Sequence, residues 1–469
     1  MTQTVSSFLD RKLYINKALS DFNLDTDGII FDCYKDKKEM LIKALNIRNV
    51  VMALVVIGGV FMVPNTPHAA PRSVAEINAN PQVLNGLRFS KTDMKRLDIQ
   101  NVHIKGMVFD NIQADNFRFI NVTFENCTFT LVNFQSCRFE NVAFINCVIQ
   151  GRGDPKDINN STIFRYSVFK DVLFENTKMN NVIADNISGE GGYVYFRNMH
   201  EVSPRGGEGP ILVGSDLHCR VVDSNFTKAN FLIRGNNNTS FYARNSKFTK
   251  ATLQSGHIYI ENCGLKEMPI SSTGTMVVTR SVLDGVNASS DKICYYAYNQ
   301  YIDSRGIDSD LNQELGNDIF GYDGSEVYVL HKDSSPALLG FSAGRITATD
   351  INLHNPMLTQ FGEPKYPLSL NLRNVRISGG YWAVLTVDSG KWENVSIEPT
   401  VLVDRVKLDK IQAFNLEYPK GEPWKKEGEF SLDITRVSKP FSWPEVRVPT
   451  PADMGLEWWP SEPGYRHIN

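Results

Sequence analysis

Large apolar residues recur at every fifth position between Leu87 and Ile149. This register consists of Phe89, Met94, Ile99, Ile104, Phe109, Ala114, Phe119, Phe124, Phe129, Phe134, Phe139, Phe144 and Ile149. A smaller or slimmer apolar residue often lies two positions earlier, as at Val102, Val122, Cys127, Val132, Cys137, Val142 and Cys147. The same spacing returns at Phe164, Phe169, Phe174, Met179 and Ala184. A repeat of this kind determines the architecture of the segment that carries it.

A five-residue period fits neither a helix nor an ordinary strand. Five helical steps overshoot one turn by about 140°, so the large residues would spiral around a helix axis. The pattern instead predicts a chain that turns a corner after every five residues. The large residue and the residue two before it then point inward, and polar residues occupy the remaining positions. Backbone groups pair with the coils above and below, as in other solenoids.

The blocks at residues 122–126, 127–131 and 137–141 resemble the repeats of the pentapeptide-repeat family. In that family a small residue is followed by any residue and then by Leu or Phe. Here Val and Cys often stand in the small position. The resemblance implies an all-β solenoid, a right-handed quadrilateral β-helix, over residues 87–187. It implies little about chemistry, because the function of a fold resides in its sites.

Beyond residue 187 the repeat loosens. The segment 188–216 is predicted to be a loop-rich insertion, because it contains a cluster of Gly and Pro residues. An apolar, polar, polar, small pattern then recurs at irregular spacing over 217–417. We expect further, less regular β-helix coils there, although such strands are also compatible with a separate β-sandwich. The segment 418–469 is rich in Pro and Trp and is expected to be a tail or a cap strapped over the last coils.

The first 86 residues have a different character. Residues 1–48 are predicted to be helical, 49–64 to form an apolar helix, and 65–86 to be a linker. The candidate membrane-anchor residues are Val50, Val51, Leu54, Val55, Val56, Ile57, Val60, Phe61, Met62 and Val63. Basic residues between Lys35 and Arg48 precede this run. The positive-inside rule therefore predicts a single-pass protein whose N-terminus is cytoplasmic and whose β-helix lies on the far side of the bilayer.

Two other interpretations of the apolar run remain open. It is short for a membrane span, which needs roughly 20 apolar residues. It is compatible with the apolar core of a signal peptide, although residues 66–70 make a poor cleavage site. It is also compatible with a buried helix that caps the solenoid, since the end of a solenoid exposes apolar coils and needs a cap.

Metal and cofactor sites are not predicted. The loop from Asn23 resembles the start of a calcium-binding EF-hand, but Tyr34 stands where a bidentate Glu is needed. The seven cysteines show no zinc-ligand spacing and no disulfide framework. Three of them, Cys127, Cys137 and Cys147, occupy the small inward position of the repeat, where a free cysteine behaves as a small hydrophobic residue.

Catalytic residues are not predicted either, because the chain lacks the sequence motifs of the common catalytic sites. Some β-helices act on carbohydrates through clustered carboxylates. The candidate acids for such a role are Asp303, Asp308, Asp310 and Asp350. Loop acids are commonly only solvated, so we expect a protein that is not an enzyme. The tripeptide Arg152–Asp154 is explained by its turn-forming context.

Charge limits the possible partners. The formal net charge is −3, and acids and bases nearly cancel over residues 87–187. A mimic of DNA needs a strongly acidic surface and a nucleic-acid binder a basic one, so neither role is favoured. We expect a non-enzymatic, membrane-anchored scaffold that binds a protein partner of unknown identity through the solenoid surface and contacts the lipid bilayer. The alternatives are a secreted bacterial effector that acts at a host membrane and a carbohydrate-active β-helix.

Overall fold

The computed structural model divides the chain into two units, residues 1–67 and 68–469. It describes residues 73–456 apart from 153–156, 205–208, 236–237, 303–316, 322–324, 331–335, 338, 343, 355, 360–367, 419–424 and 427. The predicted helical region 1–48 and the anchor run Val50–Val63 lie outside these residues. Within the part that is described, no helix is both long enough and apolar enough to cross a bilayer.

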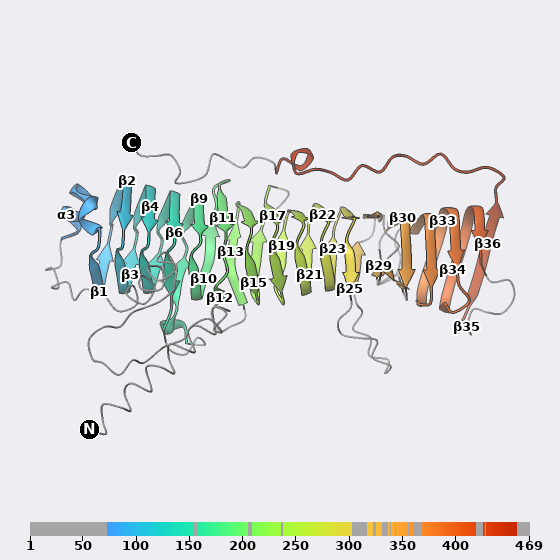
Figure 1. Ribbon diagram of the computed structural model, residues 1–469, viewed down its shortest axis with the longest axis horizontal. Coiled ribbons are helices and arrows are strands. Elements are labelled where there is room, and N and C mark those ends of the chain that lie inside the picture. Colours follow the sequence, from blue (N-terminus) through green and yellow to red (C-terminus); the bar gives the residue numbers. More distant parts are fainter. Residues whose placement is uncertain are drawn as a thin grey trace, which may run out of the picture. The chain divides into compact units, whose positions relative to one another are not determined.

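The described chain is a β-solenoid whose strands join in one parallel sheet (Figure 1). The first strands are β1 (Arg88–Lys95), β2 (Asp98–Lys105), β3 (Val108–Asp115), β4 (Arg118–Glu125), β5 (Thr128–Gln135), β6 (Arg138–Ile145), β7 (Val148–Gln150), β8 (Thr162–Arg165), β9 (Val168–Glu175), β10 (Lys178–Ser188), β11 (Tyr193–Arg197), β12 (Val202–Pro204) and β13 (Gly209–Ser215). A short 3-10 helix, η3 (Ile158–Asn160), lies between β7 and β8.

Strands β14 to β36 continue the same sheet. They are β14 (His218–Val222), β15 (Asn225–Thr227), β16 (Ala229–Arg234), β17 (Ser240–Arg244), β18 (Lys247–Thr249), β19 (Leu253–Ser255), β20 (His257–Glu261), β21 (Gly264–Ser272), β22 (Thr275–Thr279), β23 (Val282–Ser290), β24 (Ile293–Ala297), β25 (Gln300–Ile302), β26 (Asn317–Gly321), β27 (Glu326–Leu330), β28 (Pro336–Ala337), β29 (Leu339–Ser342), β30 (Arg345–His354), β31 (Met357–Thr359), β32 (Leu368–Ser378), β33 (Tyr381–Ile397), β34 (Leu402–Glu417), β35 (Lys425–Lys426) and β36 (Phe430–Arg436). The predicted solenoid is therefore confirmed, and it extends through the irregular region where a separate sandwich was the alternative.

In the regular part each coil uses 20 residues. Phe109 pairs with Phe129 and Phe119 pairs with Phe139, so equivalent positions lie four five-residue repeats apart. The pairing of Phe139 with Phe169 is 30 residues apart, because the chain between β7 and β8 forms an excursion that does not disturb the stacking. In later coils the paired residues are separated by other numbers of residues along the sequence, as for Phe241 and Ile258.

The inward positions predicted from the five-residue pattern are buried. Their phenylalanine rings stack from coil to coil, with centroids 4.8 Å apart for Phe134 and Phe164 and 5.0 Å apart for Phe144 and Phe174. Burying each such ring stabilises the fold by about 1.5–3 kcal/mol. The core therefore consists of continuous columns of side chains that run along the solenoid.

The corners of the coils carry residues in the left-handed conformation. In the repeat region this residue lies two positions after the large inward residue, as at Asn121 (φ 54°) after Phe119 and Asn126 (φ 53°) after Phe124. Asparagine tolerates this conformation better than most residues, which explains its recurrence there. The amides also hydrogen-bond from coil to coil, since Asn141 donates to Asn121 and Asn121 donates to Asn101, both at 2.8 Å.

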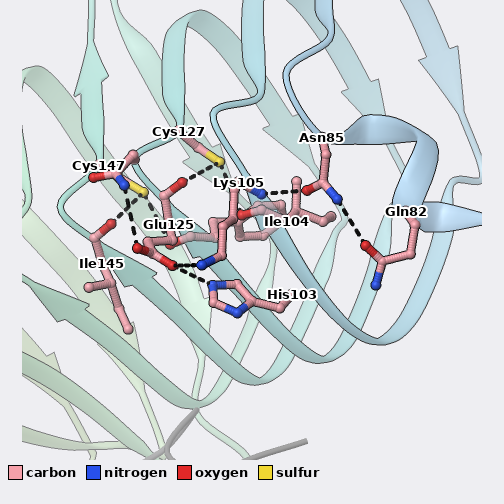
Figure 2. Close-up of polar contacts among 11 residues, drawn as sticks. Gln82, Asn85, His103, Ile104, Lys105, Glu125, Cys127, Ile145 and Cys147 are labelled. Atoms are coloured by element: carbon pink, nitrogen blue, oxygen red, sulfur yellow. Dashed lines mark hydrogen bonds and ion pairs between the residues drawn. The ribbon is translucent and has the colours of Figure 1, made fainter. Parts of the chain in front are cut away.

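A short helical cap covers the first coil. It consists of α3 (Val74–Ala79) and the 3-10 helix η2 (Pro81–Leu84), both from the segment expected to be a linker. Ile77 and Leu84 are fully buried against the solenoid core. Asn85 accepts a hydrogen bond from the backbone N–H of Lys105 at 2.7 Å (Figure 2), which ties the cap to β2 in the first coil. This cap covers apolar core residues at the first end of the solenoid.

The six described cysteines are free and buried. The Cys127 thiol donates to the carbonyls of Ile104 and Glu125, and the Cys147 thiol donates to that of Ile145 (Figure 2). Burial raises the pKa of Cys137 to about 12. These thiols fill space in the core, as their positions in the repeat predicted.

We predict that Phe129→Ala lowers the free energy of unfolding by about 3–5 kcal/mol, because it leaves a cavity in a column of stacked rings. The matched control is Gln135→Ala on the exposed surface of the same strand, which should change stability by less than about 0.5 kcal/mol. Denaturant titration measures both values. Equal losses at the two positions would contradict the inward assignment of Phe129.

Candidate binding groove between the solenoid and its C-terminal strap

A second column of side chains lies on the outside of one face of the solenoid. Its members follow one another as register partners in successive coils, and they alternate along their strands with core residues. We call this set the outer column: Ala143, Leu173, Tyr195, Arg220, Tyr242, Tyr259, Val277, Tyr295, Tyr328, Thr347, Asn371 and Lys391. Much of it is aromatic or aliphatic, which is unusual for positions that face away from the core.

The C-terminal part of the chain covers much of the outer column. After β36 the chain turns back, and residues 437–456, which we call the strap, run along the solenoid against the direction of coil addition (Figure 1). The strap begins near Glu393 in a late coil and reaches Tyr242 and Tyr259 in much earlier ones, where Leu456 is buried against them. The Pro/Trp-rich tail therefore extends far beyond the last coils, over which it was expected to form a cap.

One carboxylate holds the start of the strap. Glu393 is only 7% exposed, and its Oε2 accepts hydrogen bonds from the backbone N–H of Phe441 at 2.8 Å and from Nε1 of Trp443 at 2.9 Å. Lys391 lies 5.9 Å from the centre of the Phe441 ring. Hydrogen bonds to a charged acceptor are roughly twice as strong as neutral ones, so Glu393 is the main polar attachment of this part of the strap.

The far end of the strap is shaped by a turn. Asp453 accepts hydrogen bonds from the backbone N–H and the hydroxyl of Thr450, at 2.8 and 2.7 Å. These bonds, followed by the ion pair with Arg447, hold the pKa of Asp453 below its usual value. The 3-10 helix η5 (Ala452–Met454) follows, and Gly455 ends it with a φ of 67°. Leu456 is thereby directed onto the outer column.

A groove of about 480 Å³ lies between the strap and the later coils. This volume is within the range of about 300–1,000 Å³ that is typical of ligand sites. The groove is lined by Tyr298, Tyr328, Leu330, Arg345, Thr347, Thr349, Asp350, Ser369, Asn371, Arg373, Lys391, Ser442, Trp443, Pro444, Glu445 and Val446. It combines aromatic rings with cations, acids and amides, which is a composition suited to recognition of an extended ligand.

Tyr298 is the most unusual residue of the groove. It is 39% exposed and occupies a left-handed corner, with a φ of 60°. The equivalent corner of earlier coils holds Asn245 and Asn262, which hydrogen-bond to each other at 2.8 Å. A bulky residue in this conformation costs on the order of 1–3 kcal/mol, and such strain is concentrated at functional sites. Tyr298 therefore places an exposed aromatic ring in the groove, at a corner where those earlier coils carry Asn.

The polar groups of the groove are partly engaged with one another. Arg345 forms an ion pair with Glu326 at 2.8 Å, and the Tyr328 hydroxyl donates to the same carboxylate at 2.6 Å. Burial, together with Glu326, raises the pKa of Tyr328 to about 12, so the phenol is neutral at physiological pH. Arg373 Nε lies 3.9 Å from Glu393. The groove thus presents the neutral phenol of Tyr328 beside cations that are only partly compensated by acids.

The four acids predicted as candidates for a carbohydrate site differ in where they lie. Asp350 lines the groove, where its Oδ1 accepts a hydrogen bond from Asn374 at 2.7 Å as part of a corner ladder. Asp303, Asp308 and Asp310 lie outside the described residues. In the part of the chain that is described, no group of three or more His, Cys, Asp or Glu residues is arranged to hold a metal ion.

Sequence analysis missed the outer column, although a signal was present. Tyrosine recurs between two core residues, for example in Phe241–Ala243, Ile258–Ile260 and Val327–Val329. Each tripeptide alone is an ordinary buried strand. Only the coil-to-coil register shows that the tyrosines fall on one line.

No protein-family model matches the chain, and no curated protein matches its sequence. The groove must therefore be interpreted from its own chemistry.

We predict that Glu393→Ala releases the start of the strap, because it removes the acceptor shared by Phe441 and Trp443. Amide hydrogen exchange over residues 437–446 should become about tenfold faster or more, which corresponds to the loss of a charged hydrogen bond. Glu398→Ala is the control, since Glu398 pairs with Arg376 and not with the strap. Unchanged exchange in Glu393→Ala would show that the strap is held by other contacts.

Proposed function

We propose that this protein is a non-enzymatic β-solenoid scaffold that binds an extended segment of a protein partner in the groove beside the strap. The observation that carries the proposal is that the same face already holds the strap, which runs without helix from residue 437 to residue 450, while leaving a groove of about 480 Å³ next to it. A surface that binds its own extended chain has the aromatic faces and charged anchors that peptide recognition requires.

The chemistry of the groove favours a peptide that carries a carboxylate. Three cations line it, at Arg345, Arg373 and Lys391, against the two acids Asp350 and Glu445. Tyr298 and Trp443 add rings on which an apolar or proline-containing segment can pack. Aromatic and arginine side chains are also the residue types that dominate the energetics of protein interfaces.

Two finer assignments belong to the same proposal. The coil of four five-residue sides, with a left-handed corner after each side, supports a right-handed quadrilateral β-helix of the pentapeptide-repeat type.

The apolar run at 50–63, with basic residues before it, supports a bilayer anchor that places the solenoid across the membrane from the N-terminus. A bacterial effector secreted to a host membrane is the alternative localisation. Protease accessibility of residues 87–187 in fractionated cells separates the two.

A carbohydrate ligand is the second candidate, because aromatic rings beside Asp350 and Asn371 also suit a sugar. If the protein cleaved polysaccharides, Asp350→Asn would abolish that activity. A saccharide that binds to the wild type, but not to the Tyr298→Ala variant, would favour this candidate over a peptide.

We predict that peptides selected on the wild-type protein from a library of linear peptides lose about tenfold or more in affinity for the Tyr298→Ala variant. Isothermal titration calorimetry measures the change. Tyr166→Ala is a matched control, because Tyr166 is also an exposed tyrosine at a left-handed corner, with a φ of 51°, but does not line the groove. Equal affinities for the wild type and Tyr298→Ala would contradict binding in the groove.

A further inference from the structure

The groove extends along the solenoid axis beside the strap (Figure 1). Its lining residues on the solenoid run from the coil of Tyr298 to that of Lys391, through Tyr328, Thr347 and Asn371 in the coils between. Successive coils are about 4.8 Å apart, so this length is about 19 Å. A ligand that follows the groove therefore crosses the strands instead of lying parallel to one.

The floor of the groove offers no backbone partners to such a ligand. Strands β27, β30, β32 and β33, which form the floor, are each paired with a neighbour on both sides. An added strand needs a free sheet edge, so the ligand cannot extend the sheet. A ladder with the strap would be interrupted at Pro444, which lines the groove and has no N–H.

The strap shows how a segment is held on this face without backbone pairing. Residues 440–450 belong to no helix or strand. Among the described residues, no backbone–backbone hydrogen bond involves residues 440–449, and the Trp443 side chain is anchored by Glu393 instead. Prolines recur in this stretch, at Pro440, Pro444 and Pro449.

The groove is rich in hydrogen-bond donors. Arg345, Arg373 and Lys391 line it, and guanidinium and ammonium groups donate but do not accept. Lys391 contacts the Phe441 ring and forms none of the ion pairs among the described residues. A complementary ligand presents carbonyl oxygens and few N–H groups. A proline-rich segment does so, because proline has no N–H and a polyproline II helix has no internal hydrogen bonds.

The aromatic side chains of the groove suit the same ligand. Tyr298 is exposed there, and Tyr328 and Trp443 are half-buried. Aromatic-lined grooves are the usual receptors of polyproline II segments. A polyproline II helix rises about 3.1 Å per residue, so about six residues span the 19 Å of the groove.

We propose that the groove binds a proline-rich segment of the partner in the polyproline II conformation. This inference rests on the proposed function and narrows its ligand to a backbone that needs no pairing with the sheet. Proline rings pack on Tyr298 and Trp443. The donors of Arg345, Arg373 and Lys391 bind the carbonyl groups of the segment. A polyproline II segment is ordered before it binds, so it loses less conformational entropy than a flexible one.

Two matched libraries of eight-residue synthetic peptides test this assignment on the full-length protein. One has proline at positions 3 and 6, which share a face of a polyproline II helix, and the other has alanine there. The tightest binders should come from the proline library, and replacing both prolines by alanine should weaken them about tenfold or more in isothermal titration calorimetry. Tyr298→Ala should weaken them similarly, whereas Tyr166→Ala, outside the groove, should not.

The outcomes separate this inference from the proposed function. If alanine-library peptides bind as tightly as proline-library peptides and lose affinity for Tyr298→Ala, the proline assignment is overturned and the proposed function stands. Proline-library peptides that bind Tyr298→Ala and the wild type equally would also overturn the assignment, because they would bind outside the groove. The absence of binders in both libraries would contradict the inference and the proposed function together.

Discussion

Hydrogen bonding between successive coils is the constraint on which this structure depends. No coil can satisfy its own backbone groups, so each must match the register of its neighbours over its whole length. That match holds at a spacing of 20 residues in the regular part, as for Phe109 and Phe129, and across later coils of varied length, as for Phe241 and Ile258. The insertion between β7 and β8 leaves the stack and returns in register, since Phe139 still pairs with Phe169. Some other strand pairs, such as β32 with β33, contain a register shift.

The same constraint creates the binding surface. Equivalent residues of successive coils lie directly above one another. Tyrosines that recur between two core residues therefore line up as the continuous outer column. Tyr242 and Tyr259 bind the strap through Leu456, while Tyr328 lies in the groove that the strap leaves open. The solenoid thus acts as a rigid support on which a row of outward side chains recognises extended chain. Its own strap and the proposed partner use neighbouring parts of that row.

The sequence predicted the inside of this molecule better than its outside. The five-residue period identified the buried columns, because alternation of large apolar and polar residues reports directly on burial. It did not identify the left-handed corners, since Asn121 and Asn126 resemble any other exposed polar residues until the coil geometry is known. A strap over the last coils was predicted, but its path along the earlier coils was beyond prediction for a different reason. A segment rich in Pro and Trp has no period, and its contacts depend on which coil each of its residues faces.

The regular stacking of the coils depends on a left-handed corner after each five-residue side. Reciprocal substitutions at two corners test this dependence most directly, because Leu131 and Asn121 both occupy left-handed corners with a φ of 54°. A left-handed backbone costs most residues about 1–2 kcal/mol and spares Asn. Denaturant titration should therefore show that Leu131→Asn raises the free energy of unfolding by about 1 kcal/mol and that Asn121→Leu lowers it by at least as much. A loss of stability for Leu131→Asn, or no loss for Asn121→Leu, would contradict the account.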